Sequence, residues 1–118
     1  GEHISISHSK ELVAIILSKI KTGIDIEKIS NKTLLVSEKF INKEKRKNLT
    51  QEKATIIWSA KEAIYKWYQR KKINFTKDIK LSNFKVEQKG VVKAYFKEEK
   101  LMIKYEKINT HYLVYVCK

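Results

Sequence analysis

The sequence is poor in several features that would place it in particular protein classes. It contains one cysteine, Cys117, so a disulfide framework within the chain and a cysteine-ligated metal site are both excluded. No apolar run is long enough to span a bilayer. Proline is absent altogether, and nothing about function follows from that. The single cysteine is compatible with a reducing cytoplasm, where we expect the protein to act.

Charged residues are abundant, and most of them are basic. The 118 residues include 26 Lys and Arg against 13 Asp and Glu, which gives a formal net charge of +13. Such a charge favours an anionic partner, such as nucleic acid, an acidic protein, a phosphorylated ligand or a membrane surface. The length suits one domain over residues 1–118, and the 42% hydrophobic content suits a modest core.

Three short strands are predicted near the N-terminus. Residues 3–7 and 24–27 alternate between apolar and polar side chains, and residues 12–17 form a continuous apolar run typical of a buried strand. Because these segments are short and follow one another closely, we expect them to form a small antiparallel sheet.

The longest periodic segment predicts a helix from Gln51 to Arg70, with Thr50 placed to cap its N-terminus. One face carries an apolar stripe at helical spacing, formed by Ile57, Ala60, Ile64 and Trp67. The neighbouring face carries three residues spaced four apart, Trp58, Glu62 and Lys66. A carboxylate flanked by lysines beside a buried stripe suits a site for metal and phosphate, although an ordinary solvated face has the same pattern.

The remaining segments complete an α+β pattern. Residues 32–41 have helical spacing, residues 42–49 suit a short helix or helical turn, and residues 73–80 suit a loop. Four later segments are typical of strands, and Gly90 lies where a hairpin turn is expected; the strands are residues 81–87, 91–97, 101–106 and 111–117. We therefore predict an antiparallel sheet packed against one long helix.

Two carboxylates and a histidine are candidates for chemistry. Asp25 and Glu27 are two residues apart on a predicted strand, so both side chains project from one face. Partly buried carboxylates repel each other, and Mg²⁺ would relieve this, because it binds carboxylates, water and substrate phosphates. An ordinary polar strand face explains the same pair. Ser7 and His8 end the first predicted strand, where a histidine can bind phosphate, act as a base or be structural.

The order of three motifs is more specific than any one of them. Ser7-His8-Ser9 is followed by Gly23-Ile24-Asp25-Ile26-Glu27 and then by the segment from Trp58 to Lys66. Together they resemble the 4′-phosphopantetheinyl transferase superfamily. Residues 37–44 resemble the helix that this family places between its last two motifs, so the resemblance covers about the first 70 residues. The remaining residues agree with the family only in being rich in predicted strands.

The resemblance implies an enzyme of the holo-acyl-carrier-protein synthase type. Such enzymes move the 4′-phosphopantetheine arm of coenzyme A onto a serine of an acyl or peptidyl carrier protein, with Mg²⁺ as cofactor. Their carrier proteins serve fatty acid, polyketide or peptide synthesis. Carrier proteins are typically acidic, which agrees with the basic composition of this chain.

The resemblance also implies roles for individual residues. Asp25, Glu27 and Glu62 would bind Mg²⁺. Glu62 would accept the serine proton, directly or through a metal-bound water, and Lys66 would neutralise charge on the phosphates. The residues implied to contact coenzyme A are Ser7, His8, Lys61 and Lys66.

One feature of this chain departs from the family. It has the length of the short family type, which forms trimers, but carries motifs of the second half of a longer, two-half type. In both types the coenzyme A pocket lies between two copies of the fold. The chain would therefore self-associate as a dimer or trimer, be completed by a missing half, or be a degenerate relative that binds coenzyme A without catalysis. We prefer self-association, because a lone half exposes apolar segments and a sheet edge.

A non-catalytic basic domain that binds nucleic acid is the alternative function. Its support is a group of aromatic and basic side chains, namely Tyr65, Trp67, Tyr68, Arg70, Lys71 and Lys72. This alternative leaves Asp25, Glu27 and Glu62 unexplained, because carboxylates repel phosphate unless a cation intervenes. The preferred interpretation involves neither nucleic acid nor a membrane.

Overall fold

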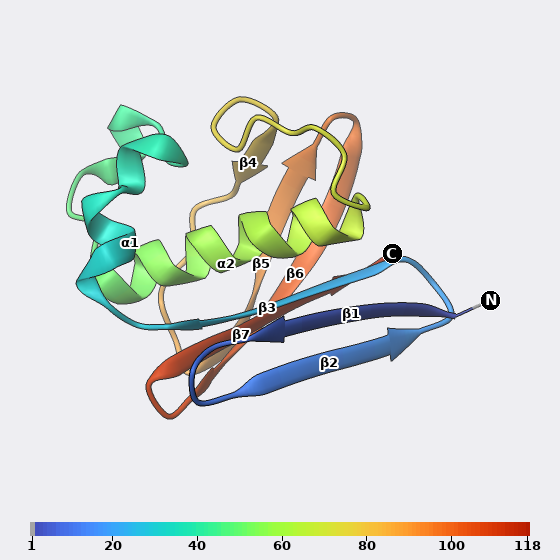
Figure 1. Cartoon of the computed structure of the whole chain (residues 1–118). Helices are drawn as coiled ribbons and strands as arrows, with labels where there is room; N and C mark the ends of the chain where they lie inside the picture. The colour runs from blue at the N-terminus through green and yellow to red at the C-terminus, as the bar shows by residue number, and fades with distance from the viewer. Residues whose placement is uncertain (1) are drawn as a thin grey trace.

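The computed structural model describes residues 2–118, which form a β-hairpin, a five-stranded antiparallel sheet and one long helix (Figure 1). The hairpin consists of β1 (His3–His8) and β2 (Val13–Ser18). The five-stranded sheet has, in spatial order, β3 (Thr22–Lys28), β7 (His111–Cys117), β6 (Glu99–Ile108), β5 (Lys89–Phe96) and β4 (Ile79–Leu81). The long helix, α2 (Gln51–Trp67), packs on one face of this sheet. The predicted α+β class is confirmed.

Short helical segments connect β3 to α2. They are α1 (Asn31–Leu35) and two 3₁₀ turns, η1 (Ser37–Lys39) and η2 (Lys43–Arg46). They replace the longer helix that the spacing of residues 32–41 allowed. No helix within residues 2–118 is long and apolar enough to cross a membrane.

Helix α2 forms as the sequence predicts, except at its C-terminal end. The Thr50 hydroxyl accepts the Lys53 N–H at 3.1 Å and caps the N-terminus. All four residues of the predicted apolar stripe are buried, with exposed fractions between 0% and 7%. The helix ends at Trp67, because Gln69 and Arg70 adopt left-handed backbone angles, with φ of 61° and 59°.

The three N-terminal strands do not form one sheet, so that prediction was wrong. β3 pairs with β7, and β1 and β2 form a separate hairpin beside β3. Serine side chains take the place of ladder bonds between β1 and β3. Ser5 Oγ accepts the Ile24 N–H at 3.0 Å, and Ser7 Oγ accepts the Ile26 N–H at 3.0 Å. These hydroxyls satisfy backbone donors on the edge of β3 that β7 does not cover.

The apolar run predicted as a buried strand is buried on one face only. Ala14 of β2 is 9% exposed, and it packs with Ile24 and Ile26 of β3. The opposite face of the hairpin has nothing packed on it within residues 2–118. Its apolar side chains are between 49% and 68% exposed; we call this set the hairpin outer face, formed by Ile4, Ile6, Val13, Ile15 and Leu17.

The C-terminal strands follow the prediction more closely, with two differences. Residues 82–88 are irregular, so the predicted strand 81–87 is reduced to the end of β4. Gly90 lies inside β5 rather than in a turn. It faces Tyr105 of β6, whose hydroxyl oxygen would lie 2.7 Å from a Cβ at this position. A strand glycine can mark such a close approach as readily as a turn.

Candidate functional site

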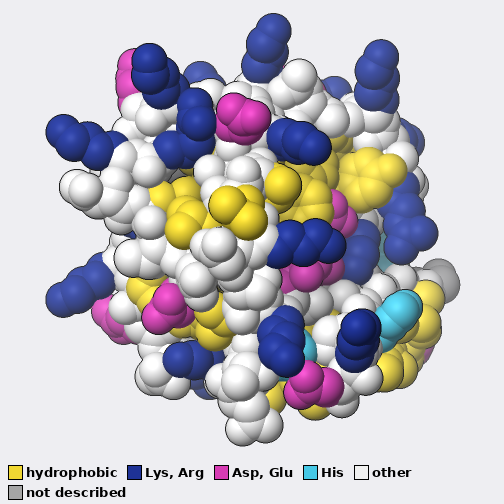
Figure 2. All heavy atoms as spheres, turned by 60° about the vertical axis from the view of Figure 1, so that its left-hand side comes forward, with side chains coloured by type: hydrophobic (Ala, Val, Ile, Leu, Met, Phe, Trp, Pro, Cys, Tyr) yellow, Lys and Arg dark blue, Asp and Glu magenta, His cyan; other side chains and the backbone are white. Residues whose placement is uncertain are grey.

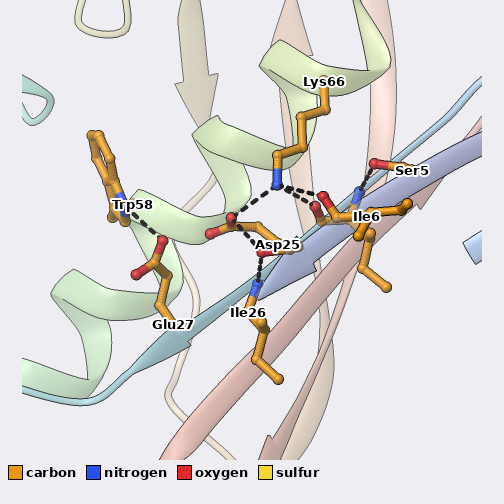
Figure 3. Close-up of polar contacts among 9 residues, drawn as sticks. Ser5, Ile6, Asp25, Ile26, Glu27, Trp58 and Lys66 are labelled. Carbon is orange, nitrogen blue, oxygen red and sulfur yellow. Dashed lines mark hydrogen bonds and ion pairs between the residues drawn. The ribbon is translucent and has the colours of Figure 1, made fainter. Parts of the chain in front are cut away.

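The candidate site lies where α2 crosses β3 (Figure 3). β3 is covered on both sides: its isoleucines face the hairpin and its alternate residues face α2. Gly23 allows the close crossing, because a Cβ there would lie 2.0 Å from the Ala63 carbonyl oxygen of α2. Asp25 and Glu27 follow at two-residue intervals on the same face of β3. The alternation of this strand therefore directs both carboxylates toward the helix.

Asp25 is the most buried acidic group of the site, at 4% exposed. Its Oδ1 accepts hydrogen bonds from the Ser7 hydroxyl at 3.2 Å and from Lys66 Nζ at 3.3 Å. Its Oδ2 is also buried and has no hydrogen-bond partner. Burial raises the pKa of Asp25, and the charge of Lys66 opposes this rise.

Glu27 and Glu62 extend the acidic group. The Trp58 indole N–H donates to Glu27 Oε1 at 3.2 Å. Burial, followed by the charge of Asp25, raises the pKa of Glu27 to about 8. Burial and Asp25 also raise the pKa of the half-buried Glu62, although Lys66 opposes the shift. The three carboxylates therefore lie close enough to hinder one another's ionisation.

Lys66 connects helix α2 to strands β1 and β3. Its Nζ donates to the Ile24 carbonyl oxygen at 2.9 Å and to the Ile6 carbonyl oxygen at 3.4 Å, in addition to Asp25. Its side chain is 13% exposed. A cavity of about 500 Å³ opens beside it, and its lining includes further polar and basic side chains, among them His3, Ser5, Lys21 and Arg70. A polyanion could enter this cavity and reach Lys66.

The acidic group fits a hard cation. No three His, Cys, Asp or Glu side chains within residues 2–118 converge as a ready-made metal cage. However, Mg²⁺ needs only one or two carboxylates, and it completes its shell with water and substrate phosphates. The unpartnered Oδ2 of Asp25 is an available ligand atom, and the raised pKa of Glu27 reflects a carboxylate that lacks a compensating positive charge.

Lys61 does not lie with the carboxylates. It is 5% exposed and points away from them, donating to the carbonyl oxygens of Phe40 and, at 2.7 Å, Phe75. Burial, followed by the charge of Lys45, lowers the pKa of Lys61 to about 8. Its expected contact with phosphate stays a prediction, and this placement gives no support to it.

Ser7 and His8 have different positions although they are adjacent. Ser7 is buried, and its hydroxyl is already bonded to Asp25 and to the Ile26 N–H. His8 is exposed and does not line the cavity beside Lys66. Their contacts with coenzyme A also stay predictions. The structure instead assigns Ser7 a part in positioning Asp25.

Trp58 is the site residue whose contact the sequence did not reveal. Besides donating to Glu27, its ring packs against Phe40 and Phe75, with ring centroids 5.2 and 5.7 Å apart. The available signal was its position four residues before Glu62, on the same helix face. Sequence spacing shows that shared face, but not which strand residue lies opposite.

Two of the aromatic residues proposed for stacking on nucleic acid already have contacts within the protein. Trp67 is 2% exposed, and its indole N–H donates to the Lys118 carbonyl oxygen at 3.1 Å. The Tyr68 hydroxyl accepts from Lys97 at 2.9 Å. Trp67 therefore cannot stack on a base without leaving the core.

Comparison with known proteins agrees with the arrangement of this site. A protein-family model described as the 4′-phosphopantetheinyl transferase superfamily matches residues 21–117. No curated protein matches the chain. The matched region contains Asp25, Glu27, Glu62 and Lys66, and hairpin strands β1 and β2 precede it. Because the match spans well over half of the sequence, the chain belongs to the 4′-phosphopantetheinyl transferase superfamily.

Proposed function

We propose that this chain transfers the 4′-phosphopantetheine group of coenzyme A to a serine of an apo acyl or peptidyl carrier protein, with Mg²⁺ as cofactor. The observation that carries the proposal is the buried Asp25. It lies between Lys66 and two further carboxylates and keeps one oxygen without a partner. This group lies in the part of the chain that matches the family.

The reaction requires positioning and charge neutralisation rather than a covalent intermediate on the protein. The serine oxygen forms a bond to the β-phosphorus of the pyrophosphate of coenzyme A. The bond from that phosphorus to the bridging oxygen breaks, and adenosine 3′,5′-bisphosphate leaves with the electron pair. The serine proton passes to a base.

The residues of the site are suited to these tasks. Asp25, Glu27 and Glu62 would hold Mg²⁺, which when bound neutralises negative charge on pyrophosphate oxygens. Trp58 fixes the orientation of Glu27 through its indole N–H. Glu62 is the proposed acceptor of the serine proton, because it is a half-buried carboxylate beside Asp25.

Lys66 is the proposed phosphate ligand. Two of its three contacts are long, at 3.3 Å to Asp25 and 3.4 Å to the Ile6 carbonyl oxygen. In the proposal, a phosphate oxygen takes the place of these two longer contacts. The adjoining cavity of about 500 Å³, with Lys21 and Arg70 in its lining, would receive the other charged groups of coenzyme A.

The transfer can be tested directly. The purified chain is incubated with coenzyme A, Mg²⁺ and an apo carrier protein, and the carrier is weighed by mass spectrometry. We expect a mass gain of one phosphopantetheine group that is lost with EDTA. No gain at any chain concentration, with a carrier that an established transferase modifies in parallel, would refute the transfer proposal.

We also propose that two or more copies of this chain assemble through the hairpin outer face. Its five side chains are large, apolar and at least 49% exposed. Residues 3–18 contain one Lys and one Glu, so this face escapes the repulsion that the net charge of +13 imposes elsewhere. Sedimentation should show an oligomer that Ile15→Glu converts to a monomer, whereas a monomeric wild-type chain at high concentration would contradict the assembly.

A further inference from the structure

The turn of the N-terminal hairpin is attached to the five-stranded sheet by a hydrogen bond that the reaction described above does not use. Ser9 lies in the turn between β1 and β2, and His111 is the first residue of β7. Ser9 Oγ and His111 Nε2 are 2.8 Å apart, although the two residues are 102 positions apart in the sequence. The side chain of His111 is shielded from solvent, at 1% exposed. This contact therefore fixes where the hairpin turn lies on the sheet.

The other hydrogen bonds of Ser9 determine which atom donates. Its Oγ accepts the N–H groups of Glu11 at 3.2 Å and Leu12 at 3.1 Å, and these two bonds occupy both lone pairs. The hydroxyl hydrogen is then free to donate to Nε2 of His111. The ring hydrogen therefore lies on Nδ1 and points to the Thr110 hydroxyl oxygen, at 3.3 Å. Both nitrogens of the buried ring have partners, so the orientation of the ring is fixed.

This bond lies at the end of the hairpin that has no covalent connection to the sheet. The opposite end continues from β2 through residues 19–21 into β3. Figure 1 shows the turn between β1 and β2 beside the turn between β6 and β7. A two-stranded hairpin has little stability of its own. The hairpin can therefore pivot about residues 19–21 wherever its turn is not held.

The other contacts at this end are weaker or less directional. Within residues 2–118, the only other polar contact from the turn to the sheet joins Glu11 Oε1 to Lys28 Nζ, at 3.0 Å. Both side chains are more than half exposed, and Figure 2 brings this end of the molecule forward, with side chains of both charges at its surface. Exposed ion pairs contribute little. Ala14 packs on β3, but apolar contacts are non-directional and leave the exact position to polar contacts.

The position of the hairpin decides the position of two serines beside the carboxylates. The hydroxyls of Ser5 and Ser7 accept the N–H groups of Ile24 and Ile26, each at 3.0 Å. The Ser7 hydroxyl also donates to Asp25 Oδ1 at 3.2 Å. These bonds require β1 to lie at a fixed distance from β3. Because Ser7 is near the turn, a displacement of the turn moves it away from Asp25.

We propose that Ser9 and His111 are positioning residues for the carboxylate site. Their hydrogen bond holds the hairpin turn on β7, and the hairpin in turn holds the Ser7 hydroxyl on Asp25. His111 acts from a distance: it pairs with Lys28 of β3, so its ring lies on the opposite face of the sheet from the next residue, Glu27. The effect on rate rests on the proposed transfer function, whereas the effect on the hairpin does not.

Hydrogen exchange, followed by NMR, tests the structural step. The amide hydrogens of Ile24 and Ile26 are bonded to hairpin serines, so they exchange when the hairpin lifts. His111→Phe keeps a buried ring but removes both nitrogens, and it should speed exchange at both amides about tenfold while β6 amides change less than about twofold. His111→Gln, whose amide oxygen can replace Nε2 as an acceptor, should restore slow exchange. Glu11→Gln, the control for the exposed ion pair, should change exchange less than about twofold.

The transfer reaction tests the link to the site. His111→Phe should raise the Mg²⁺ concentration for half-maximal rate about tenfold, because Asp25 loses the hydroxyl that orients it. His111→Gln should recover most of this loss, and Glu11→Gln should match the wild-type chain.

Three results would overturn the positioning role. They are unchanged exchange at Ile24 and Ile26, equal acceleration of the β6 amides, which would mean that His111 supports only overall stability, and an unchanged Mg²⁺ requirement despite faster exchange. Failure of the transfer function is distinguishable, since the wild-type chain would then transfer nothing. The exchange rates would still decide whether Ser9 and His111 hold the hairpin beside Asp25.

Discussion

The two sides of helix α2 carry opposite charge patterns. Toward β3, the carboxylates Asp25, Glu27 and Glu62 have raised pKa values, and Lys66 forms an ion pair with Asp25. Toward β4, the lining of a second cavity contains five lysines and one glutamate, and burial, followed by the charge of Lys45, lowers the pKa of Lys61 to about 8. Glu62 and Lys61 are consecutive in the sequence, yet each belongs to the side where its own charge is in excess.

The strands and turns that face the helix create this difference. β3 supplies two carboxylates toward α2, whereas η2 and the region around β4 supply lysines. On each side, charged groups of one sign are partly buried without enough groups of the opposite sign. Burial therefore disfavours the ionised form of these side chains unless an opposite charge binds nearby. The excess of carboxylates on the β3 side is the feature on which the proposed binding of Mg²⁺ rests.

The largest effect is expected from Gly23→Ala, which disrupts the β3 side alone. The added Cβ would lie 2.0 Å from the Ala63 carbonyl oxygen and 2.7 Å from the Trp67 backbone nitrogen, and helix backbone cannot yield easily. We expect the free energy of unfolding to fall by about 3 kcal/mol, with loss of transfer, because α2 must move away from Asp25. Thermal and urea unfolding measure the change.

Gly90→Ala is the matched control for this variant. Its Cβ would meet the side chain of Tyr105 rather than helix backbone, at 2.7 Å from the hydroxyl oxygen, so the buried ring would have to shift. We expect a smaller loss of stability and retained transfer. If Gly23→Ala were as stable as the wild-type protein, the close crossing of β3 and α2 would be wrong.

The next largest effect is expected from neutralising the carboxylates. Asp25→Asn and Glu62→Gln should each lower kcat for transfer by about 100-fold or more, because the site then loses an Mg²⁺ ligand or its base. Folding should be retained, since burial already favours the neutral form of both groups. Carrier modification followed by mass spectrometry gives the rate, and circular dichroism checks the fold.

Glu98→Gln is the matched control, because it removes an exposed carboxylate from the turn between β5 and β6. It should transfer within about twofold of the wild-type rate. Full activity in Asp25→Asn would overturn the role of the acidic group in the reaction.

The sequence predicts those parts of the molecule that depend on local pattern. The α2 stripe, the alternation of β3 and the Thr50 cap follow from periodicity and capping chemistry, and all three are confirmed. The strand period places Asp25 on the face of β3 opposite its isoleucines, and the helix period places Glu62 beside the apolar stripe of α2. The sequence pattern therefore allowed the two carboxylates to be predicted close together. The extent of one domain over residues 1–118 stays a prediction.

The failed predictions concern choices between distant partners. Nothing local indicates that β3 pairs with β7, nearly 90 residues later in the chain, rather than with β2. The direction of Lys61 is also a choice between distant partners, although its expected contact with phosphate stays a prediction. Its motif position suggested phosphate, but the carbonyls of Phe40 and Phe75, from two separate loops, determine where it points. Helical spacing gives the angle of a side chain around the axis and leaves its partners undetermined.

The smallest expected effect concerns Lys61, on the β4 side of α2, and it is a change in the pH dependence of stability. The pKa of Lys61 is lowered from its ordinary value of 10.5 to about 8, first by burial and then by Lys45. Between these two values the unfolded chain holds the proton and the folded chain does not. The free energy of unfolding therefore gains from this group as pH rises from about 8 toward 10.5.

Lys61→Met lacks this titration, so wild-type stability should increase relative to the variant over that pH range. Urea unfolding at a series of pH values measures the difference, with Lys93→Met as the control for an exposed lysine. A wild-type advantage that stays constant with pH would mean that folding does not lower the pKa of Lys61. A rising advantage would show that the burial of Lys61 disfavours its charged form in the folded chain.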